Sequence, residues 1–152
     1  MKSGSPRAAL NAPVRPSDPA IKLGIWSNPN NVDLDKPLIY RIEMWSEDGK
    51  YFDYIGKARD ALRLKEYDRN MKKIHERRER GKTQKYRAVH YALSQAIREG
   101  WKCECYPMEN CGTDQLNFKE QQLICSYRCT LNGGKGWTVA DIDSISIEAL
   151  IR

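Results

Sequence analysis

The chain has 152 residues, enough for one compact domain with its own core but too few for two ordinary domains and a linker. No apolar run approaches the roughly 18 residues of a membrane span, and residues 1–16 contain no apolar segment typical of a secretory signal. We therefore expect an intracellular, cytoplasmic protein with no membrane partner. Lysine and arginine number 26 against 20 aspartate and glutamate, a formal charge of +6 that favours a polyanionic partner.

The first 36 residues are rich in proline. Six of the seven prolines of the chain lie before residue 38. Because proline fixes φ and has no backbone N–H, this density prevents a regular helix or a central strand. We expect residues 1–36 to form a partly disordered N-terminal extension that docks on the domain through four apolar residues, Ile21, Leu23, Ile25 and Trp26.

Strand patterns begin directly after this extension. Residues 38–45 (LIYRIEMW) have the composition and near-alternation of a strand, and residues 46–49 (SEDG) supply turn residues. Residues 50–56 (KYFDYIG) then resume strand composition. The sequence predicts a β-hairpin over this region.

Helical spacing follows the hairpin. Apolar residues recur every three or four positions over residues 64–74, with Asp60 as an N-cap and Gly81 as a stop signal. A second helix is predicted from about Thr83, with Gly100 just past its end. Two consecutive helices are therefore expected before the next strand.

The remaining pattern completes a mixed domain. Residues 101–108 predict a third strand that ends near Pro107, and residues 114–128 predict a third helix. We therefore expect an α+β fold over residues 37–137: a small three-stranded antiparallel sheet flanked by helices, in the order β-β-α-α-β-α. The pattern of residues 138–152 fits a strand or a short helix, so this tail carries no prediction.

Positive charge is concentrated in one segment. Residues 57–87 contain 13 basic and five acidic residues, a net charge of +8, which leaves −2 for the rest of the chain. A localised basic stripe is typical of phosphate neutralisation, although a solvated helix with internal ion pairs would have a similar composition. The candidate nucleic-acid contacts are Lys57, Arg59, Lys72, Lys73, Arg77 and Arg78.

A set of separate motifs carries the chemistry. LIY at 38–40 and YIG at 54–56 lie on the two strands of the hairpin, Arg63 lies on the first helix, Glu120 on the third helix and Asn132 twelve residues later. In this order and on these elements, they resemble the GIY-YIG nuclease superfamily, with leucine in place of the first glycine. The resemblance covers residues 37–137 and depends on the motifs together with their secondary-structure context.

Three features depart from the family pattern. The gap between the two tripeptides is 13 residues, longer than usual, and the hairpin turn can absorb the extra length. Arg63 comes seven residues after Gly56, where eight is commoner, so Arg59 remains a competing candidate. Tyr67 stands where some members have histidine, which disfavours a histidine-based variant of the mechanism.

The resemblance implies a metal-dependent DNA endonuclease, a phosphodiester hydrolase that uses Mg²⁺ or Mn²⁺. It also implies that Asn132 holds the loop after the third helix by side-chain hydrogen bonds. No further DNA-binding domain is evident, which favours a stand-alone enzyme of restriction, phage or mobile-element type. The catalytic candidates are Tyr40, Tyr54, Arg63, Glu120 and Asn132, with Glu120 as the metal ligand.

The chemistry of these side chains supports the same assignment. Glu120 offers hard oxygen ligands to a hydrated Mg²⁺, and Arg63 offers a rigid donor fork to the scissile phosphate. Tyr40 or Tyr54 could orient or deprotonate the attacking water. An ordinary phenol has a pKa of about 10, so the base role requires depression of that pKa by Arg63 and Lys57.

Other interpretations remain open from the sequence. Each candidate taken singly could be an ordinary strand aromatic, surface charge or turn residue. The protein could be a non-catalytic nucleic-acid-binding module, or a zinc-containing interaction domain built on its five cysteines. The cysteine spacing favours buried reduced thiols. One site per chain would need a homodimer, or two successive nicks, to cut both strands.

Overall fold

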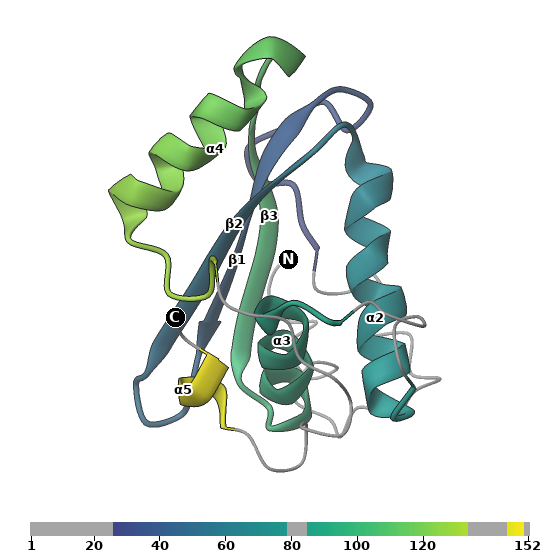
Figure 1. Cartoon of the computed structure of the whole chain (residues 1–152), viewed down its shortest axis with the longest axis vertical. Coiled ribbons are helices and arrows are strands. Elements are labelled where there is room, and N and C mark those ends of the chain that lie inside the picture. The colour runs from purple at the N-terminus through teal and green to yellow at the C-terminus, as the bar shows by residue number, and fades with distance from the viewer. Residues whose placement is uncertain (1–25, 79–84, 134–145, 151–152) are drawn as a thin grey trace.

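The computed structural model describes residues 26–78, 85–133 and 146–150 of the chain (Figure 1). Three strands, β1 (Leu38–Trp45), β2 (Tyr51–Ala58) and β3 (Lys102–Asn110), form one antiparallel sheet in the order β2-β1-β3. Helices lie on both faces of this sheet. The predicted α+β fold, with a small three-stranded antiparallel sheet flanked by helices, is confirmed.

The first two strands form the predicted hairpin. Gly49 closes its turn with a φ of +89°, a conformation that residues with a Cβ rarely adopt. The register pairs Tyr40 with Gly56 and Ile42 with Tyr54. Because directly paired residues of antiparallel strands share a face, Tyr40 and Tyr54 project from the same side of the sheet.

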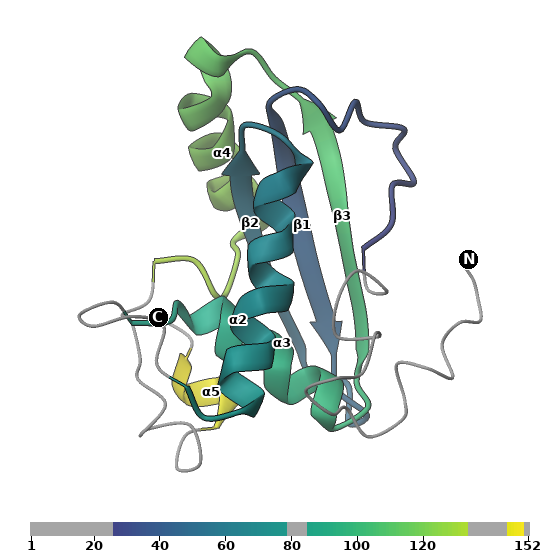
Figure 2. The ribbon, with the colours of Figure 1, turned by 90° about the vertical axis from the view of Figure 1, so that its right-hand side faces the viewer.

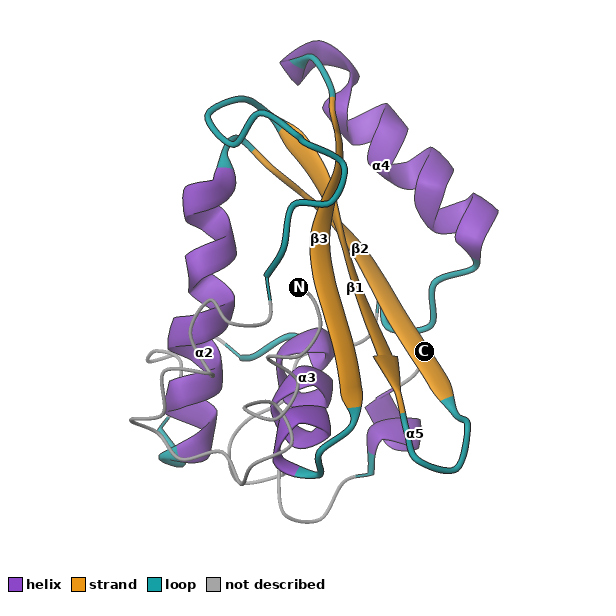
Figure 3. Cartoon of the chain, turned by 180° about the vertical axis from the view of Figure 1, so that it is seen from behind, coloured by secondary structure: helices purple, strands orange, loops and turns teal. Residues whose placement is uncertain are grey.

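Helices cover the sheet and connect its strands. After the hairpin come the 3₁₀ helix η2 (Ala61–Leu64), α2 (Lys65–His75) and α3 (Ala88–Arg98), and after β3 come α4 (Thr113–Tyr127) and α5 (Ile147–Leu150). The first two α-helices lie on one face of the sheet and α4 on the other (Figures 2 and 3). The predicted order is confirmed, with η2 and α5 as additions.

Both helix boundaries in the basic segment differ from the prediction. The first helix ends at His75 instead of Gly81, because Arg77 takes a left-handed φ of 58° that a helix cannot continue through. The second begins at Ala88 instead of about Thr83, because the residue before it is extended, with φ −74° and ψ 155°. Gly81 and Thr83 themselves lie outside the described residues.

The third strand continues beyond its predicted end. It runs through Pro107 to Asn110, and a register shift between Ile39 and Tyr40 accommodates the proline. Proline is tolerated here because β3 is at the edge of the sheet, where one row of backbone groups is not needed for pairing.

Two apolar cores stabilise the sheet. The larger core fills the space between the sheet and α2, α3 and α5, and its completely buried side chains include Tyr67, Met71 and Leu93. The smaller core lies under α4 and is formed by Ile39, Ile55, Leu116 and Cys129. All five cysteines are free thiols, three of them buried.

The described end of the N-terminal extension packs on the domain. Trp26 forms an isolated parallel bridge with Cys105 of β3, and Val32 is buried in the larger core. The predicted docking is therefore confirmed for Trp26, whereas Ile21, Leu23 and Ile25 lie outside the described residues. Within the described parts of the chain, none of the helices has the length and apolar character needed to span a membrane.

Candidate active site

A cavity of about 460 Å³ lies where the ends of β1 and β2 approach η2, α4 and the start of α3. We refer to it as the site cavity. It brings together two catalytic candidates from the hairpin, both candidate arginines, and the predicted metal ligand. Its lining residues are Tyr40, Tyr54, Lys57, Ala58, Arg59, Asp60, Arg63, Arg87, Leu116 and Glu120.

The two phenols of the hairpin lie next to each other in the wall of the site cavity. The ring centroids of Tyr40 and Tyr54 are 6.3 Å apart. The Tyr40 ring lies directly over Gly56, where an added Cβ would overlap the Cζ and hydroxyl of that ring. Glycine at the end of YIG is thus required by the close approach of Tyr40. Leu38, at the position of the first glycine of the family motif, is a fully buried core residue.

Both phenols have hydrogen-bond partners, and both are buried. The hydroxyls of Tyr40 and Tyr67 are 2.6 Å apart, and Tyr54 accepts a hydrogen bond of 2.8 Å from Nη1 of Arg87. Burial raises the pKa of Tyr40 and of Tyr54, and this outweighs the lowering by Arg87 and Arg63. The lowered pKa that a base role requires is therefore not found for either phenol, and both are protonated at neutral pH.

Two arginines remain candidates for the phosphate-binding role. Arg63 lies in η2, which begins at its N-cap Asp60, whose Oδ1 accepts the Leu62 N–H at 2.9 Å. Arg59 lies just before this helix, and both arginines are exposed and line the site cavity. The side chain of neither arginine makes a hydrogen bond or an ion pair with any described residue. Their donors are free to bind an anion in the cavity.

The predicted metal ligand, Glu120, is held near β2 by its neighbours on α4. Leu116, one turn before it, is buried in the smaller core. Lys57 Nζ donates to Asn117 Oδ1 at 2.6 Å and lies 3.6 Å from Glu120 Oε1. The Glu120 side chain is 12% exposed, so its carboxylate lies at the edge of solvent beside the phenols.

The donor set of the site cavity fits a hydrated hard cation. Glu120 supplies one carboxylate, a typical protein contribution to a Mg²⁺ site in which waters complete the coordination. Asp60 also lines the cavity, but its Oδ1 is used in capping η2. In the described parts of the chain, no group of three His, Cys, Asp or Glu side chains could hold a metal ion, so a four-ligand zinc site is not formed there.

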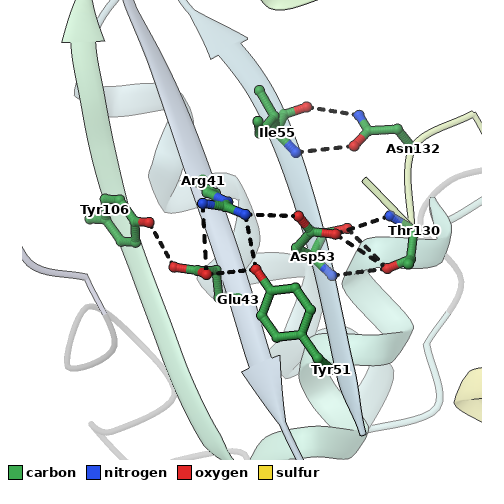
Figure 4. Close-up of polar contacts among 8 residues, drawn as sticks. All are labelled: Arg41, Glu43, Tyr51, Asp53, Ile55, Tyr106, Thr130 and Asn132. Carbon is green, nitrogen blue, oxygen red and sulfur yellow. Dashed lines mark hydrogen bonds and ion pairs between the residues drawn. The ribbon is translucent and has the colours of Figure 1, made fainter. Parts of the chain in front are cut away.

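Asn132 does not line the site cavity but holds the strand that carries Tyr54 (Figure 4). Its Oδ1 accepts from the Ile55 N–H at 3.1 Å, and its Nδ2 donates to the Ile55 carbonyl at 2.8 Å. Ile55 lies between Tyr54 and Gly56, so this pair of bonds fixes the YIG backbone. The loop-holding bonds implied by the resemblance are present, so Asn132 ties its loop to the backbone of β2.

A polar network on the other face of the hairpin supports the same loop (Figure 4). The Asp53 N–H donates to Thr130 Oγ1 at 3.0 Å, and the Thr130 N–H donates to Asp53 Oδ1 at 3.0 Å. Asp53 Oδ2 accepts from Arg41 Nη2 at 3.1 Å, and Arg41 lies over the Tyr127 ring of α4 at 4.1 Å. We call this set the Arg41 network, and it continues through Glu43, Tyr51 and Tyr106.

The other predicted nucleic-acid contacts lie at the far end of α2. Lys72 follows Arg63 by nine residues, which corresponds to about 14 Å along the helix axis at about 1.5 Å of rise per residue. Lys72 is exposed and Lys73 half-buried. Arg77 donates to the Ile74 carbonyl at 3.2 Å, and Arg78 pairs with Glu76 at 2.6 Å. The two arginines are also exposed but bond to residues at their own helix end, whereas the structure gives no such bond for the two lysines among the described residues.

The sequence did not identify Arg87 as a site residue. It follows α2 and a segment outside the described residues, and it lines the site cavity beside Tyr54. No motif marks it, because its position depends on how α3 packs behind β1 and β2. Its membership in the basic segment was the one available signal.

No protein-family model matches the chain, and no curated protein and no solved structure matches it. The resemblance to GIY-YIG nucleases therefore stays a prediction from the sequence motifs, four of whose residues line the site cavity.

Proposed function

We propose that this protein is a metal-dependent DNA endonuclease of GIY-YIG type that hydrolyses phosphodiester bonds. The observation that carries the proposal is the site cavity, in which four catalytic candidates from four elements face one space: Tyr40, Tyr54, Arg63 and Glu120. A random set of strand aromatics and surface charges would not be expected to share one cavity.

The side chains of the site cavity match the needs of phosphodiester hydrolysis. The reaction needs an activated water, stabilisation of charge on the phosphate, and help for the departing 3′ oxygen. Arg63 or Arg59 supplies unused N–H donors and positive charge to the phosphate. Because burial keeps Tyr40 and Tyr54 protonated, we favour a role in orienting the water or donating a proton over a phenolate base.

Glu120 is the residue that would hold Mg²⁺ or Mn²⁺. Such an ion, when bound, would neutralise charge on the phosphate and lower the pKa of a coordinated water. Lys57, 3.6 Å from the carboxylate, balances the charge of Glu120 in the absence of the cation. The same lysine then lies close enough to contact a phosphate oxygen.

The basic surface supports DNA as the substrate. Arg59 and Lys57 flank the site cavity, and Lys72 and Lys73 extend positive charge along α2. These residues can contact phosphates that flank the scissile one. With one site per chain, cleavage of both strands would use a homodimer or two successive nicks, in an enzyme of restriction, phage or mobile-element type.

Nicking of supercoiled plasmid tests the proposal. Purified protein should convert supercoiled DNA to nicked and linear forms in Mg²⁺ or Mn²⁺, and EDTA should stop the reaction. Glu120→Gln, which keeps the shape of the side chain, should bind DNA but not cut it. Binding without turnover by the wild type in either metal would instead establish the alternative function, a non-catalytic nucleic-acid-binding module.

A further inference from the structure

Arg87 occupies the N-cap position of α3, yet its side chain makes no capping hydrogen bond. Its Nη1 donates to the Tyr54 hydroxyl at 2.8 Å, and its guanidinium carbon lies 5.7 Å from the Tyr54 ring centroid and 6.0 Å from that of Tyr67. Its Nη2 is 3.5 Å from Nε2 of His90. The guanidinium is therefore engaged with the Tyr54 hydroxyl, with two phenol rings and with His90 in the first turn of α3.

The charge of Arg87 is not paired directly with a carboxylate. Within the described residues it forms no ion pair, although it is half-buried beside aromatic rings. Arg41, on the opposite face of the hairpin, also donates to a phenol, Tyr51, but is paired with the carboxylates of Asp53 and Glu43. Burial opposes the charge of Arg87, while the nearby phenols and the carboxylate of Glu66 favour it. The charge therefore lies beside the Tyr54 hydroxyl without an ion pair to any described residue.

Hydrogen-bond capacity sets the direction of the Tyr54 proton. A guanidinium can only donate, whereas a phenol has one proton and two lone pairs. Tyr54 must therefore accept from Arg87, and its own proton takes no part in that bond. Tyr54 lines the site cavity and also interacts with the Tyr67 hydroxyl, so besides that hydroxyl a water or a phosphate oxygen bound in the cavity can accept this proton.

We propose that Arg87 is a positioning residue that holds the Tyr54 hydroxyl as a proton donor directed at the site cavity. The inference rests on the proposed function and adds a second arginine with a separate task. Arg63 acts on the phosphate itself, whereas Arg87 acts through Tyr54.

A double-mutant cycle in single-turnover cleavage of a DNA duplex tests this assignment. Arg87→Met and Tyr54→Phe should each slow cleavage, on the order of 10²-fold, and the double variant should be no slower than the worse single variant. The matched control is the cycle of Arg63→Met with Tyr54→Phe, in which the two losses should multiply. DNA affinity should stay unchanged in Arg87→Met.

Two further measurements keep the test independent of folding defects. Arg87→Lys, which keeps the charge and one donor, should recover part of the lost rate. The free energy of unfolding should be measured for the wild type, Arg87→Met, Tyr54→Phe and the double variant. The losses of stability in the two single variants should not add up in the double variant, whether or not DNA is cut.

The outcomes separate this inference from the proposed function. Multiplicative losses for Arg87→Met and Tyr54→Phe in an active enzyme would overturn the role of Arg87 alone, as would weakened DNA binding with normal turnover. A folded wild type that never cleaves DNA in Mg²⁺ or Mn²⁺ would overturn the proposed function and this inference with it.

Discussion

The two faces of the β1–β2 hairpin carry similar residue types with different hydrogen-bonding states. On one face, the two oxygens of Glu43 accept hydrogen bonds from Tyr51 and Tyr106, each at 2.6 Å, and both oxygens of Asp53 also accept hydrogen bonds. On the other face, the phenols Tyr40 and Tyr54 border a cavity of about 460 Å³. There, the side chains of Arg59 and Arg63 make no hydrogen bond or ion pair with any described residue.

Residue type alone does not define a site. Tyrosine, arginine and carboxylate occur in both the Arg41 network and the site cavity, but in the network they satisfy one another and stabilise the fold. In the site cavity, donors and the carboxylate of Glu120 remain available to a ligand. We therefore expect substitutions in the Arg41 network to lower stability, and substitutions in the site cavity to lower turnover.

The largest expected effect contrasts two glutamates. Glu120→Gln should reduce cleavage by on the order of 10³-fold, because it removes the carboxylate that would hold the metal ion, with little change in stability. The matched Glu43→Gln variant should cut DNA at near the wild-type rate once folded. Single-turnover cleavage and thermal unfolding of both variants make the comparison. Near-normal cleavage by Glu120→Gln would remove this residue from the mechanism.

Stability should respond most strongly to the loss of Asp53. Its side chain is 2% exposed and pairs with Arg41, so Asp53→Ala removes the nearer of the two carboxylates that pair with this guanidinium and leaves the Thr130 N–H without its acceptor. We expect a loss of about 3 kcal/mol in the free energy of unfolding, measured by urea denaturation. A loss below about 1 kcal/mol would show that water replaces the carboxylate and that the network does not stabilise the loop.

Removal of a phenol hydroxyl should affect the cleavage rate in the site cavity but not in the Arg41 network. Tyr40→Phe should slow cleavage on the order of 10²-fold, because the hydroxyl that orients water or a proton is lost. Tyr106→Phe removes a hydroxyl bonded to Glu43 and should leave the rate unchanged. If Tyr40→Phe cuts normally, Tyr40 is a core residue that serves packing alone.

The pH dependence of the cleavage rate distinguishes two roles for Tyr40. Burial raises its pKa, so the phenol stays protonated through neutral pH and above. An orienting or donating role predicts that ionisation of Tyr40 contributes no slope to the rate between about pH 6 and 9. A phenolate base predicts a rate that rises about tenfold per pH unit over this range, and that dependence should disappear in Tyr40→Phe.

The smallest expected effect concerns the far end of α2. Changing Lys72, Lys73 and Arg77 to glutamine should weaken DNA affinity for all sequences without changing turnover at saturation. The slope of log K against log salt should become shallower by about 0.9 for each phosphate that the variant no longer neutralises. Because Arg77 binds the Ile74 carbonyl, we expect the two lysines to account for most of the change. An unchanged salt slope would identify this end of α2 as a solvated surface.

The sequence predicted the elements well where its patterns were local. Alternation in residues 38–45 and the spacing of Leu64, Tyr67, Met71 and Ile74 depend on each element burying one face, so strand and helix followed directly. The ends of helices and strands were harder to predict from the sequence. The left-handed Arg77 and the passage of β3 through Pro107 depend on neighbouring chain segments, which local propensity does not contain.

The α+β order and the identities of the residues that carry the proposed chemistry could be predicted from the sequence. Which of these residues contact one another depends on the tertiary structure. The strand register places Tyr40 over Gly56, and the packing of α4 places Glu120 near Lys57. The tertiary structure also places Asn132 within hydrogen-bond distance of Ile55 on β2, and Arg87 within hydrogen-bond distance of Tyr54. Such contacts join residues far apart in the chain, and their geometry depends on side-chain volumes and desolvation across the whole fold, so no local pattern could specify them.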